Sequence, residues 1–408
     1  MSEKTMKNIP KLRFPEFIKS EEWENTKLGE ICKFVRGPFG GSLKKEIFVK
    51  DGYAVYEQTH AIYEKFNSFR YYITEEKFNE LKRFSVDSND IIMSCSGTMG
   101  KFAIIPKHSK KGVINQALLK LTVKKEFNVN FIKTTLELPE NQEKLLSQSA
   151  GGAIKNVVSV NQIKDILVFV PNLLEQKKIA DCLSSVDSLI TAQSQKVELL
   201  KEHKNGLLQN LFPKDGENIP KIRFPEFINN EEWEEKQLGN LLDYEQPTKY
   251  LVNDTRYDDR YKTPVLTAGK TFILGYTDET NGIFRDSLPI IIFDDFTTAT
   301  QFVDFPFKAK SSAMKILKTK SNKFNIKLIF ELIQRIDYKA DEHKRYWISE
   351  YQNITIKLPK PKEQQKIADC LTSIDNEINL QIQKVESLKE HKKALLQQLF
   401  PSNEVING

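Results

Sequence analysis

Two stretches of the chain carry apolar residues at alternating spacings of four and three, the period of a helix that buries one stripe. These stretches cover residues 179–211 and 367–399. Gly206 is the only glycine or proline within either run, and Pro213 and Pro401 follow them. Because proline cannot continue a helix, the pattern predicts two helices of about 37 residues, each roughly 55 Å long.

The apolar stripe of each predicted helix is interrupted by one polar residue near its middle and one near its end. In the first helix the stripe consists of Ile179, Leu183, Val186, Ile190, Gln193, Val197, Leu200, Lys204, Leu207 and Leu211. In the second it consists of Ile367, Leu371, Ile374, Ile378, Gln381, Val385, Leu388, Lys392, Leu395 and Leu399. A heptad pattern of this length favours a coiled coil between the two helices, with the polar residues fixing its register. The alternative is that each helix packs separately on a globular core.

The chain also repeats itself outside these helices. Residues 8–31 match residues 218–241 at 16 of 24 positions, and residues 175–213 match residues 363–401 at 27 of 39 positions. Constant blocks therefore alternate with two unlike segments. The boundaries that we predict are a connector 1–23, a variable domain 24–170, a long helix 171–213, a connector 214–233, a variable domain 234–358, a long helix 359–401 and a tail 402–408.

This order of blocks fixes the direction of the helices if they pair. The first helix ends where the second variable domain begins, and the second helix leaves that domain for the C-terminus, so the pair must be antiparallel. The two variable domains would then be separated by the coiled coil. The connectors contain Pro15 and Pro225, which should exclude helix there. We expect the connectors to wrap the helix ends, with the first one beside the end of the second helix.

Both variable segments indicate an α/β (α+β) fold with a mixed sheet. Apolar β-like runs and Gly-rich turns predict strands at 54–56, 90–93, 102–105, 117–123, 264–266, 289–293, 313–317 and 354–358. Helical patterns cover residues 75–82, 130–138 and 326–336. A weak similarity between residues 112–121 and 309–317 indicates that the two segments are divergent copies of one domain.

Composition narrows the class of protein only slightly. The chain has 61 Lys+Arg and 55 Asp+Glu, a formal charge of +6, and residues 301–327 hold seven Lys and one Asp. Such a stretch suits a phosphate backbone, although a solvated lysine surface is the plain alternative. Four cysteines without a CxxC pair fit a reducing cytoplasm. We recognise no apolar run long enough for a membrane span, and no signal peptide.

Three polar loops within the variable segments could carry chemistry. Residues 36–45 combine three glycines with basic side chains, without the order of a phosphate-binding loop; a surface hairpin is the alternative. Residues 94–101 follow a strand and offer hydroxyl groups, but lack the GxSxG of a hydrolase. Residues 294–301 place two carboxylates after a strand, where they could ligate magnesium or accept hydrogen bonds from cytosine.

The repeated blocks resemble a known family. Each long helix opens with the motif P-x-x-x-EQ-x-x-IA-x-x-L-x-x-x-D, and the motif W-x-x-x-x-LG starts at the last residue of each connector. The first copies are Pro171, Glu175–Gln176, Ile179–Ala180, Leu183 and Asp187, with Trp23 and Leu28–Gly29. The second copies are Pro359, Glu363–Gln364, Ile367–Ala368, Leu371 and Asp375, with Trp233 and Leu238–Gly239. This arrangement resembles the specificity (S) subunits of type I restriction–modification systems.

The resemblance implies that each variable segment is a target-recognition domain that reads one half of a split sequence in double-stranded DNA. It implies that the coiled coil sets the spacer, that two methyltransferase (M) subunits dock on this chain, and that restriction–translocation (R) subunits join that core. We find no methylation motif or Walker A loop, so we expect no catalysis and no cofactor here. S-adenosylmethionine would bind the partner methyltransferase.

Loop placement and polarity then select candidate DNA contacts. In the first segment these are Arg36, Ser42, Lys44, Lys45, Gln58, His60, Ser94, Ser96, Thr98, Lys101, Asn115 and Gln116. In the second they are Lys270, Tyr276, Asp294, Asp295, Thr297, Thr298, Gln301, Lys308, Lys310, Ser311 and Ser312. Three alternatives stay open: a self-sufficient modifying enzyme, a coiled-coil scaffold without DNA contact, and an S-like subunit of another restriction class.

Overall fold

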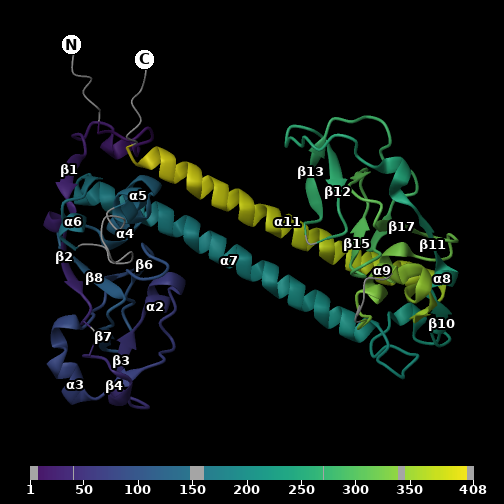
Figure 1. The fold of residues 1–408 in the computed structure, drawn as a ribbon, viewed down its shortest axis with the longest axis horizontal. Coiled ribbons are helices and arrows are strands. Elements are labelled where there is room, and N and C mark those ends of the chain that lie inside the picture. Colours follow the sequence, from purple (N-terminus) through teal and green to yellow (C-terminus); the bar gives the residue numbers. More distant parts are fainter. Residues whose placement is uncertain (1–7, 40, 148–159, 270, 339–344, 402–408) are drawn as a thin grey trace, which may run out of the picture. The chain divides into compact units, whose positions relative to one another are not determined.

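The chain forms two compact units in a computed structural model that describes residues 8–39, 41–147, 160–269, 271–338 and 345–401 (Figure 1). The first unit runs to Ala192 and takes up the chain again at Val385, and the second unit is Gln193–Lys384. Each unit therefore holds one variable domain and a part of both long helices.

The long helices are α7 (Leu173–Leu211) and α11 (Pro361–Leu399), with 39 residues each. Every residue of the predicted stripes is buried or half-buried, so the heptad prediction is confirmed. In the first unit the Nζ atom of Lys392 lies 2.6 Å from a carboxylate oxygen of Asp187. In the second, Lys204 lies 2.7 Å from Asp375. The two ion pairs are equivalent, because Lys204 is the repeat mate of Lys392 and Asp187 is the repeat mate of Asp375. None of the described helices is long and apolar enough to cross a membrane.

The contacts also show that the helix segments run antiparallel within each unit. In the first unit Ile179, near the start of α7, shares a core with Leu399 at the end of α11. In the second unit Leu211, at the end of α7, shares a core with Ile367 near the start of α11. The direction predicted from the order of blocks is therefore confirmed inside each unit.

The polar residues at the middle of the stripes pair with each other. The Nε2 atom of Gln193 donates to Oε1 of Gln381, which is the repeat mate of Gln193. Gln381 in turn donates to Glu377 at 2.6 Å, and Lys196 donates to the same carboxylate at 3.3 Å. A contact between a residue and its own repeat mate is what an antiparallel pair of like helices produces.

The described residues of the first unit's domain form two sheets and a short two-stranded ribbon. The larger sheet has the order β2-β8-β5-β6, and the smaller one has the order β4-β3-β7, in which β3 and β7 are parallel. The strands are β1 (Glu24–Lys27), β2 (Cys32–Arg36), β3 (Tyr53–Tyr56), β4 (Tyr72–Ile73), β5 (Ile91–Ser94), β6 (Phe102–Ile104), β7 (Gly112–Ile114), β8 (Leu118–Val123) and β9 (Leu167–Val170). The helices are α1 (Leu28–Ile31), α2 (Gln58–Tyr63), α3 (Glu75–Glu80), α4 (Val129–Glu137), α5 (Pro139–Ser147) and α6 (Val160–Lys164).

The domain of the second unit repeats this topology. Its sheets have the orders β11-β17-β14-β15 and β13-β12-β16, and β12 and β16 are parallel. The strands are β10 (Glu234–Gln237), β11 (Leu242–Glu245), β12 (Thr263–Leu266), β13 (Ile273–Thr277), β14 (Ile290–Asp294), β15 (Thr300–Val303), β16 (Lys308–Ala309), β17 (Met314–Thr319) and β18 (Thr355–Leu358). The helices are α8 (Leu238–Leu241), α9 (Ile326–Ile333) and α10 (Tyr346–Ser349). The identical strand order confirms that the two variable segments are divergent copies of one domain.

The connectors lie along the ends of the long helices, as predicted. The backbone N–H of Leu12 donates to the carbonyl oxygen of Gln398, and that of Ile222 donates to Asn210, both at 2.9 Å. The expectation that proline excludes helix was wrong, because one turn of 3-10 helix begins at each proline, η1 (Pro15–Phe17) and η4 (Pro225–Phe227). The fixed φ of proline suits the first residue of such a turn, whose N–H needs no helical partner.

Candidate nucleic-acid interface

The polar loops chosen from the sequence of the first domain meet at one edge of its sheets. Three backbone hydrogen bonds hold them together. The N–H of Gly37 donates to Leu118 at 3.0 Å, that of Asn115 to Tyr56 at 2.9 Å, and that of Cys95 to Ala117 at 2.8 Å. The loops after β2, β3 and β5 are thereby joined to the turn between β7 and β8. We call this surface the first edge: residues 36–39, 41–45, 57–58, 94–101 and 115–117.

A glycine makes the closest of these approaches possible. A Cβ atom built on Gly37 would lie 1.9 Å from the carbonyl oxygen of Asn115, far inside van der Waals contact. Any other residue would push the loop that follows β2 away from the β7–β8 turn. The glycine in the motif at residues 36–45 therefore serves to bring two polar loops together, and it does not itself form an anion site.

Most candidate side chains of the first edge are accessible. Lys44, Lys45, Thr98, Lys101 and Gln116 are exposed, and a further group is half-buried, namely Arg36, Ser42, Gln58, Ser96 and Asn115. Two atoms within this group, Nη1 of Arg36 and Oε1 of Gln58, are buried and have no hydrogen-bond partner in the protein. A buried polar atom without a partner costs free energy, and a ligand that reached this edge could relieve that cost.

A cleft of about 480 Å³ lies between these loops, next to aromatic side chains. Asn115, Gln116 and Lys45 line it together with Phe48 and Tyr71, whose rings stack with centroids 4.3 Å apart. Amide side chains can both donate and accept hydrogen bonds at base edges, and lysine suits phosphate. The aromatic residues were not among the sequence candidates, because nothing in their spacing distinguishes them from core aromatics.

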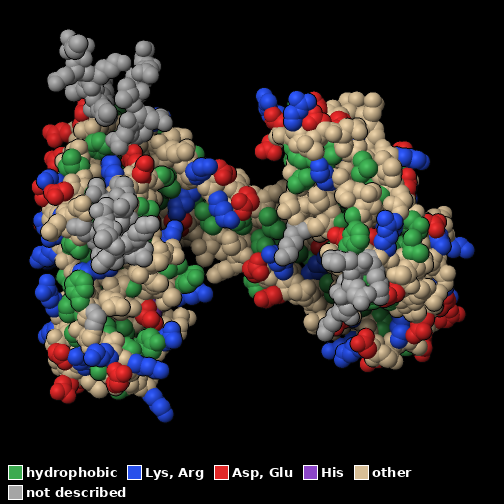
Figure 2. Space-filling view, viewed as in Figure 1, with side chains coloured by type: hydrophobic (Ala, Val, Ile, Leu, Met, Phe, Trp, Pro, Cys, Tyr) green, Lys and Arg blue, Asp and Glu red, His purple; other side chains and the backbone are tan. Residues whose placement is uncertain are grey.

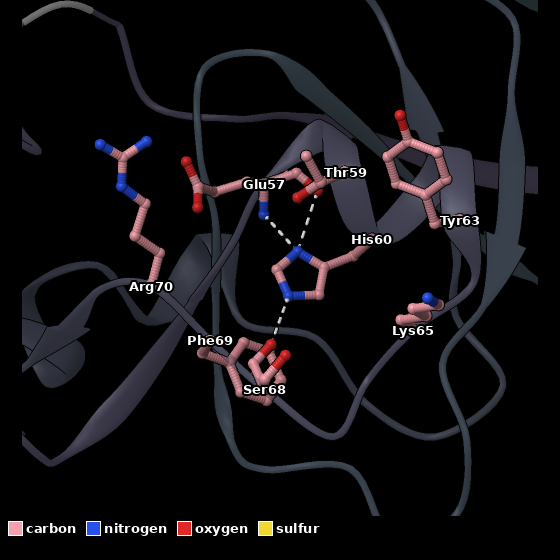
Figure 3. A pocket seen from close by; sticks show the side chains of 8 residues that line it. All are labelled: Glu57, Thr59, His60, Tyr63, Lys65, Ser68, Phe69 and Arg70. Carbon is pink, nitrogen blue, oxygen red and sulfur yellow. Dashed lines mark hydrogen bonds between the residues drawn. The ribbon is translucent and has the colours of Figure 1, made fainter. Parts of the chain in front are cut away.

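Two candidates of the first domain are enclosed by protein. Ser94 is fully buried, and its Oγ atom accepts a hydrogen bond from the N–H of Lys101 at 3.0 Å. His60 is buried at the start of α2, where Nδ1 accepts from the N–H of Glu57 at 3.0 Å and Nε2 lies 3.3 Å from the carbonyl oxygen of Ser68 (Figure 3). Both side chains shape loops, and we do not retain them as DNA contacts.

The second domain brings its candidates to the equivalent edge. The N–H of Lys310 donates to Leu266 at 2.9 Å, and that of Asp295 donates to Ala313 at 3.2 Å, which joins the ends of β12 and β14 to the β16–β17 turn. We call residues 294–299 and 310–313 the second edge. Its exposed or half-buried candidates are Asp294, Thr297, Thr298, Lys310, Ser311 and Ser312. Gln301 lies further along β15, and Tyr276 pairs with Pro264 toward the opposite end of β12.

The carboxylates of the second edge already have protein partners. Asp294 accepts hydrogen bonds from the N–H groups of Phe296 and Thr297, at 2.9 and 3.3 Å. Asp295 is buried, lies 3.2 Å from Nζ of Lys315 and accepts from the N–H of Trp347 at 3.0 Å. Asp295 is therefore part of the domain interior and is not retained as a DNA contact. Asp294 stays accessible but is held by its own loop.

The basic stretch at residues 301–327 is largely neutralised. Five of its seven lysines form ion pairs with carboxylates: Lys308 with Glu279, Lys315 with Asp295, Lys318 with Glu245, Lys320 with Asp243, and Lys327 with Glu331 and Asp375. Lys308 is buried, so it too is not retained, and Lys270 lies outside the described residues. On the face drawn in Figure 2, basic and acidic side chains are interspersed over both units. The stretch is thus no free cationic stripe.

Both domains are fixed to the long helices by the same contacts. The Nη2 atom of Arg13 lies 2.7 Å from Glu175, and Nε of Arg223 lies 2.7 Å from Glu363; each arginine uses two nitrogens on the two carboxylate oxygens. All four side chains are almost completely buried. The adjacent motif glutamines reach into the domains. Each accepts a hydrogen bond at 2.9 Å from the N–H of an asparagine that caps α4 or α9, namely Asn128 or Asn325.

This arrangement gives the repeated Glu–Gln pair a physical role. The glutamate at the start of each long helix holds the connector, and the glutamine beside it holds the variable domain. We call this set of contacts the anchor, formed by Arg13, Glu175, Gln176 and Asn128 in one unit and by Arg223, Glu363, Gln364 and Asn325 in the other. Neither the arginines nor the asparagines were among the sequence candidates, although both arginines lie in a repeated block.

Comparison with known proteins matches nearly the whole chain to one family. The family model described as "Type I restriction modification DNA specificity domain" matches residues 20–202 and 230–390. The chain is 52% identical over 133 residues to the Escherichia coli type I restriction enzyme EcoR124I/EcoR124II specificity subunit, a match that spans 32% of this chain and 33% of that protein. It is 25% identical to the Methanocaldococcus jannaschii MjaVIII specificity subunit over 98% of this chain and 95% of that one.

A solved structure shares the fold over the same extent. The crystal structure of a type I restriction–modification S subunit from M. genitalium superposes with a TM-score of 0.68 at 17% sequence identity, and the match covers 97% of this chain and all of that one. At this identity the likeness concerns the fold, and it agrees with the repeated domains and long helices described above.

Proposed function

We propose a division of labour for this chain, which belongs to the type I restriction–modification DNA specificity family: each variable domain reads one half of a split DNA target, and the constant parts hold the two readers and the partner subunits. The observation that carries the proposal is the contrast within the repeat. The anchors are the same in both units, whereas the equivalent edges present different side chains. Two variable domains with different edges, held by the same anchor contacts, suit a target whose two halves differ.

The first edge would contact DNA through the accessible candidates Arg36, Ser42, Lys44, Lys45, Gln58, Ser96, Thr98, Lys101, Asn115 and Gln116. The second edge would do so through Asp294, Thr297, Thr298, Lys310, Ser311 and Ser312; Gln301 and Tyr276 lie away from this edge and stay predictions from the sequence alone. Amides and hydroxyl groups can read base edges in the major groove, where a good bidentate pair is worth roughly 1–3 kcal/mol of discrimination. Lysines would supply the salt-sensitive hold on phosphates.

The chain would act without catalysis of its own. A specificity subunit delivers the target to methyltransferase subunits, which would bind S-adenosylmethionine, and restriction–translocation subunits would join that core. We infer two methyltransferase subunits, one for each unit. The long helices would set the spacer between the half-sites, because their length is fixed by backbone hydrogen bonds. We place the complex in the cytoplasm, where the chromosome is available.

The experiment that tests this function is methylome sequencing of cells that carry the chain together with its methyltransferase partner. The proposal predicts methylation within a motif made of two short sequences separated by an unspecified spacer of constant length. A single uninterrupted motif would contradict it.

Two rival functions are separated by simpler measurements. A self-sufficient enzyme would modify DNA as the purified chain alone, whereas we expect no turnover. A scaffold without DNA contact would leave the methyltransferase–specificity complex unable to bind random DNA in a salt-sensitive manner, whereas we expect binding that weakens as salt is raised.

A further inference from the structure

The two connectors expose the same apolar side chains. In the first unit these are Ile9, Leu12 and Ile18, and in the second they are Ile219, Ile222 and Ile228. Ile18 is 65% exposed and Ile228 is 61% exposed, each directly after the 3-10 turn that begins at the connector proline. Each of the three positions is aliphatic in both copies, and two of the three are identical.

The long helices serve as a comparison for the exposed aliphatic residues that both connectors share. They too expose large apolar residues, but the repeat mate of each one is polar or small. The pairs are Leu174 with Lys362, Leu189 with Glu377, Leu199 with Ser387, Leu380 with Ala192, and Ile382 with Ser194. Exposed apolar residues in the constant blocks have thus changed on the helices and stayed aliphatic on the connectors. A surface that keeps exposed aliphatic residues in both copies is a candidate for contact with another molecule.

The surroundings of the retained residues are also built twice. In the first unit Glu16 lies 3.0 Å from Nζ of Lys178, and that nitrogen lies 5.6 Å from the centre of the Phe14 ring. In the second unit Lys366 lies 3.1 Å from Glu226 and 5.6 Å from the centre of the Phe224 ring. We call each set, consisting of the three exposed aliphatic residues with this ion pair and ring, a connector patch. Each unit therefore presents equivalent exposed aliphatic residues with the same ion pair and ring contact.

We propose that each connector patch docks one methyltransferase subunit. This rests on the proposed function and adds to it the surface that the partner occupies. A surface that is duplicated within one chain fits a partner that binds twice in the same way. DNA does not meet that description, because the edges that would read it differ between the units, and aliphatic side chains offer no hydrogen-bond donors to a phosphate backbone.

A second copy of this chain is a poorer occupant than the methyltransferase. Each chain carries two patches, so association through patch-to-patch contacts leaves a free patch on each partner unless both contacts form at once, and it can continue into open assemblies. A methyltransferase subunit with one complementary surface would instead close the assembly at two subunits per chain.

The test is native mass spectrometry of the full chain co-expressed with its methyltransferase subunit, in the absence of DNA. We expect two methyltransferase subunits on the unmodified chain, one on Ile18→Asp, one on Ile228→Asp and none on the double variant, with at least ten-fold weaker binding at each altered patch. Leu189→Glu and Leu199→Ser are matched controls, because each gives an exposed leucine the residue that its repeat mate already has. Both should keep two subunits.

A photo-crosslinking amino acid at position 18 or 228 guards against an effect of aspartate on folding. We expect crosslinks to the methyltransferase subunit at both positions. The proposal is overturned if the double variant keeps both methyltransferase subunits at unchanged affinity, or if the crosslinks join only copies of this chain. Such a failure would leave the split methylation motif of the unmodified complex intact, whereas failure of the proposed function would remove that motif.

Discussion

The anchors of the two units have kept the same residues and contacts, whereas the edges of the two domains have diverged. The arginine–glutamate contacts of the two anchors match at 2.7 Å, and their glutamine–asparagine contacts match at 2.9 Å. At the edges, Ser94 and Cys95 at the end of β5 correspond to Asp294 and Asp295 at the end of β14, because both pairs make the same backbone contacts with the neighbouring strand and turn. The anchor residues are the same in both units because a buried charge needs its partner. The edge needs only its backbone contacts, so its side chains can differ.

The largest effect should come from breaking an anchor. Arg13→Met leaves the buried Glu175 carboxylate without its cation, and removal of one partner of a buried ion pair costs roughly 3–5 kcal/mol. Arg223→Met should cost about as much, because its contacts are the same. Chemical denaturation monitored by tryptophan fluorescence would measure both. The double variant Arg13→Met with Glu175→Met should recover most of the loss; an unaltered deficit would show that the charge is not the cause.

A smaller loss in the free energy of unfolding should follow when the ion pair between Lys308 and Glu279 in the second domain is broken. Burial alone would raise the pKa of Glu279, but the bond from Lys308 and the N–H groups of Asp254 and Asn253 outweigh it and lower that pKa to about 2. Glu279 thus stabilises the fold above its ordinary pKa of 4.5, and this is lost as the pH falls toward 2. Lys308→Met should cost roughly 1–3 kcal/mol at neutral pH.

The same variant should flatten the acid limb of the stability curve between pH 4.5 and 2, because Glu279 would then titrate closer to its ordinary value. Denaturation midpoints measured across this range would show it. An unchanged slope would mean that the low pKa comes from the backbone donors alone. The first unit has no such ion pair at the equivalent position, because the residue equivalent to Lys308 is Val113.

At the edges, substitutions should alter recognition and leave the fold unchanged. Gln116→Ala should weaken binding to one half-site by roughly 1–3 kcal/mol and relax its sequence preference, with no effect on the other half-site. Ser311→Ala should weaken binding to the other half-site and leave the first half-site unaffected. Competition binding of the methyltransferase–specificity complex to DNA with one altered half-site would measure this. Equal effects on both half-sites would contradict independent readers.

The smallest and least selective effect should come from exposed lysines. Lys44→Ala combined with Lys45→Ala should weaken binding to all sequences alike, and the slope of log affinity against log salt should fall by about 0.9 for each lost phosphate contact. Lys19→Ala, an exposed lysine on a connector, serves as the control and should leave the slope unchanged. A double variant that changed sequence preference would place these lysines at bases.

The elements that could be predicted were those whose own sequence carries the signal. The helices α7 and α11 follow from their heptads, and β5 and β14 from their apolar runs. By contrast, β1 and β10 have the sequences ENTK and EEKQ, and they are strands because they pair with β9 and β18 at the base of each domain. Such strands depend on tertiary pairing, which overrides local preference.

The sequence selected the loops that meet at each edge, but several of the individual side chains that it selected are buried. Loop position after a strand identified the edges, because strand ends of one sheet meet. It could not separate Asp294 from Asp295, since only the fold decides which of two adjacent side chains faces Lys315. Likewise the seven lysines of residues 301–327 appeared free in the sequence because their carboxylate partners, such as Glu279 and Glu245, lie elsewhere in the chain.

The proposed spacer can be tested separately. Deletion of residues 189–195 and 377–383 removes one heptad from each long helix at matching positions. We expect the methylated motif to keep both halves and to lose length only in its spacer, as read by methylome sequencing. An unchanged spacer would show that the helices do not set the separation.

Exchange of one variable domain tests whether the two domains read their half-sites independently. Residues 24–170 are replaced by the corresponding segment of another specificity subunit, with both anchors and both long helices kept, and the methylome is sequenced. We expect a motif in which one half-site is replaced, while the other half-site and the spacer length stay as they were. A change in both half-sites, or in the half-site and the spacer together, would contradict independent reading.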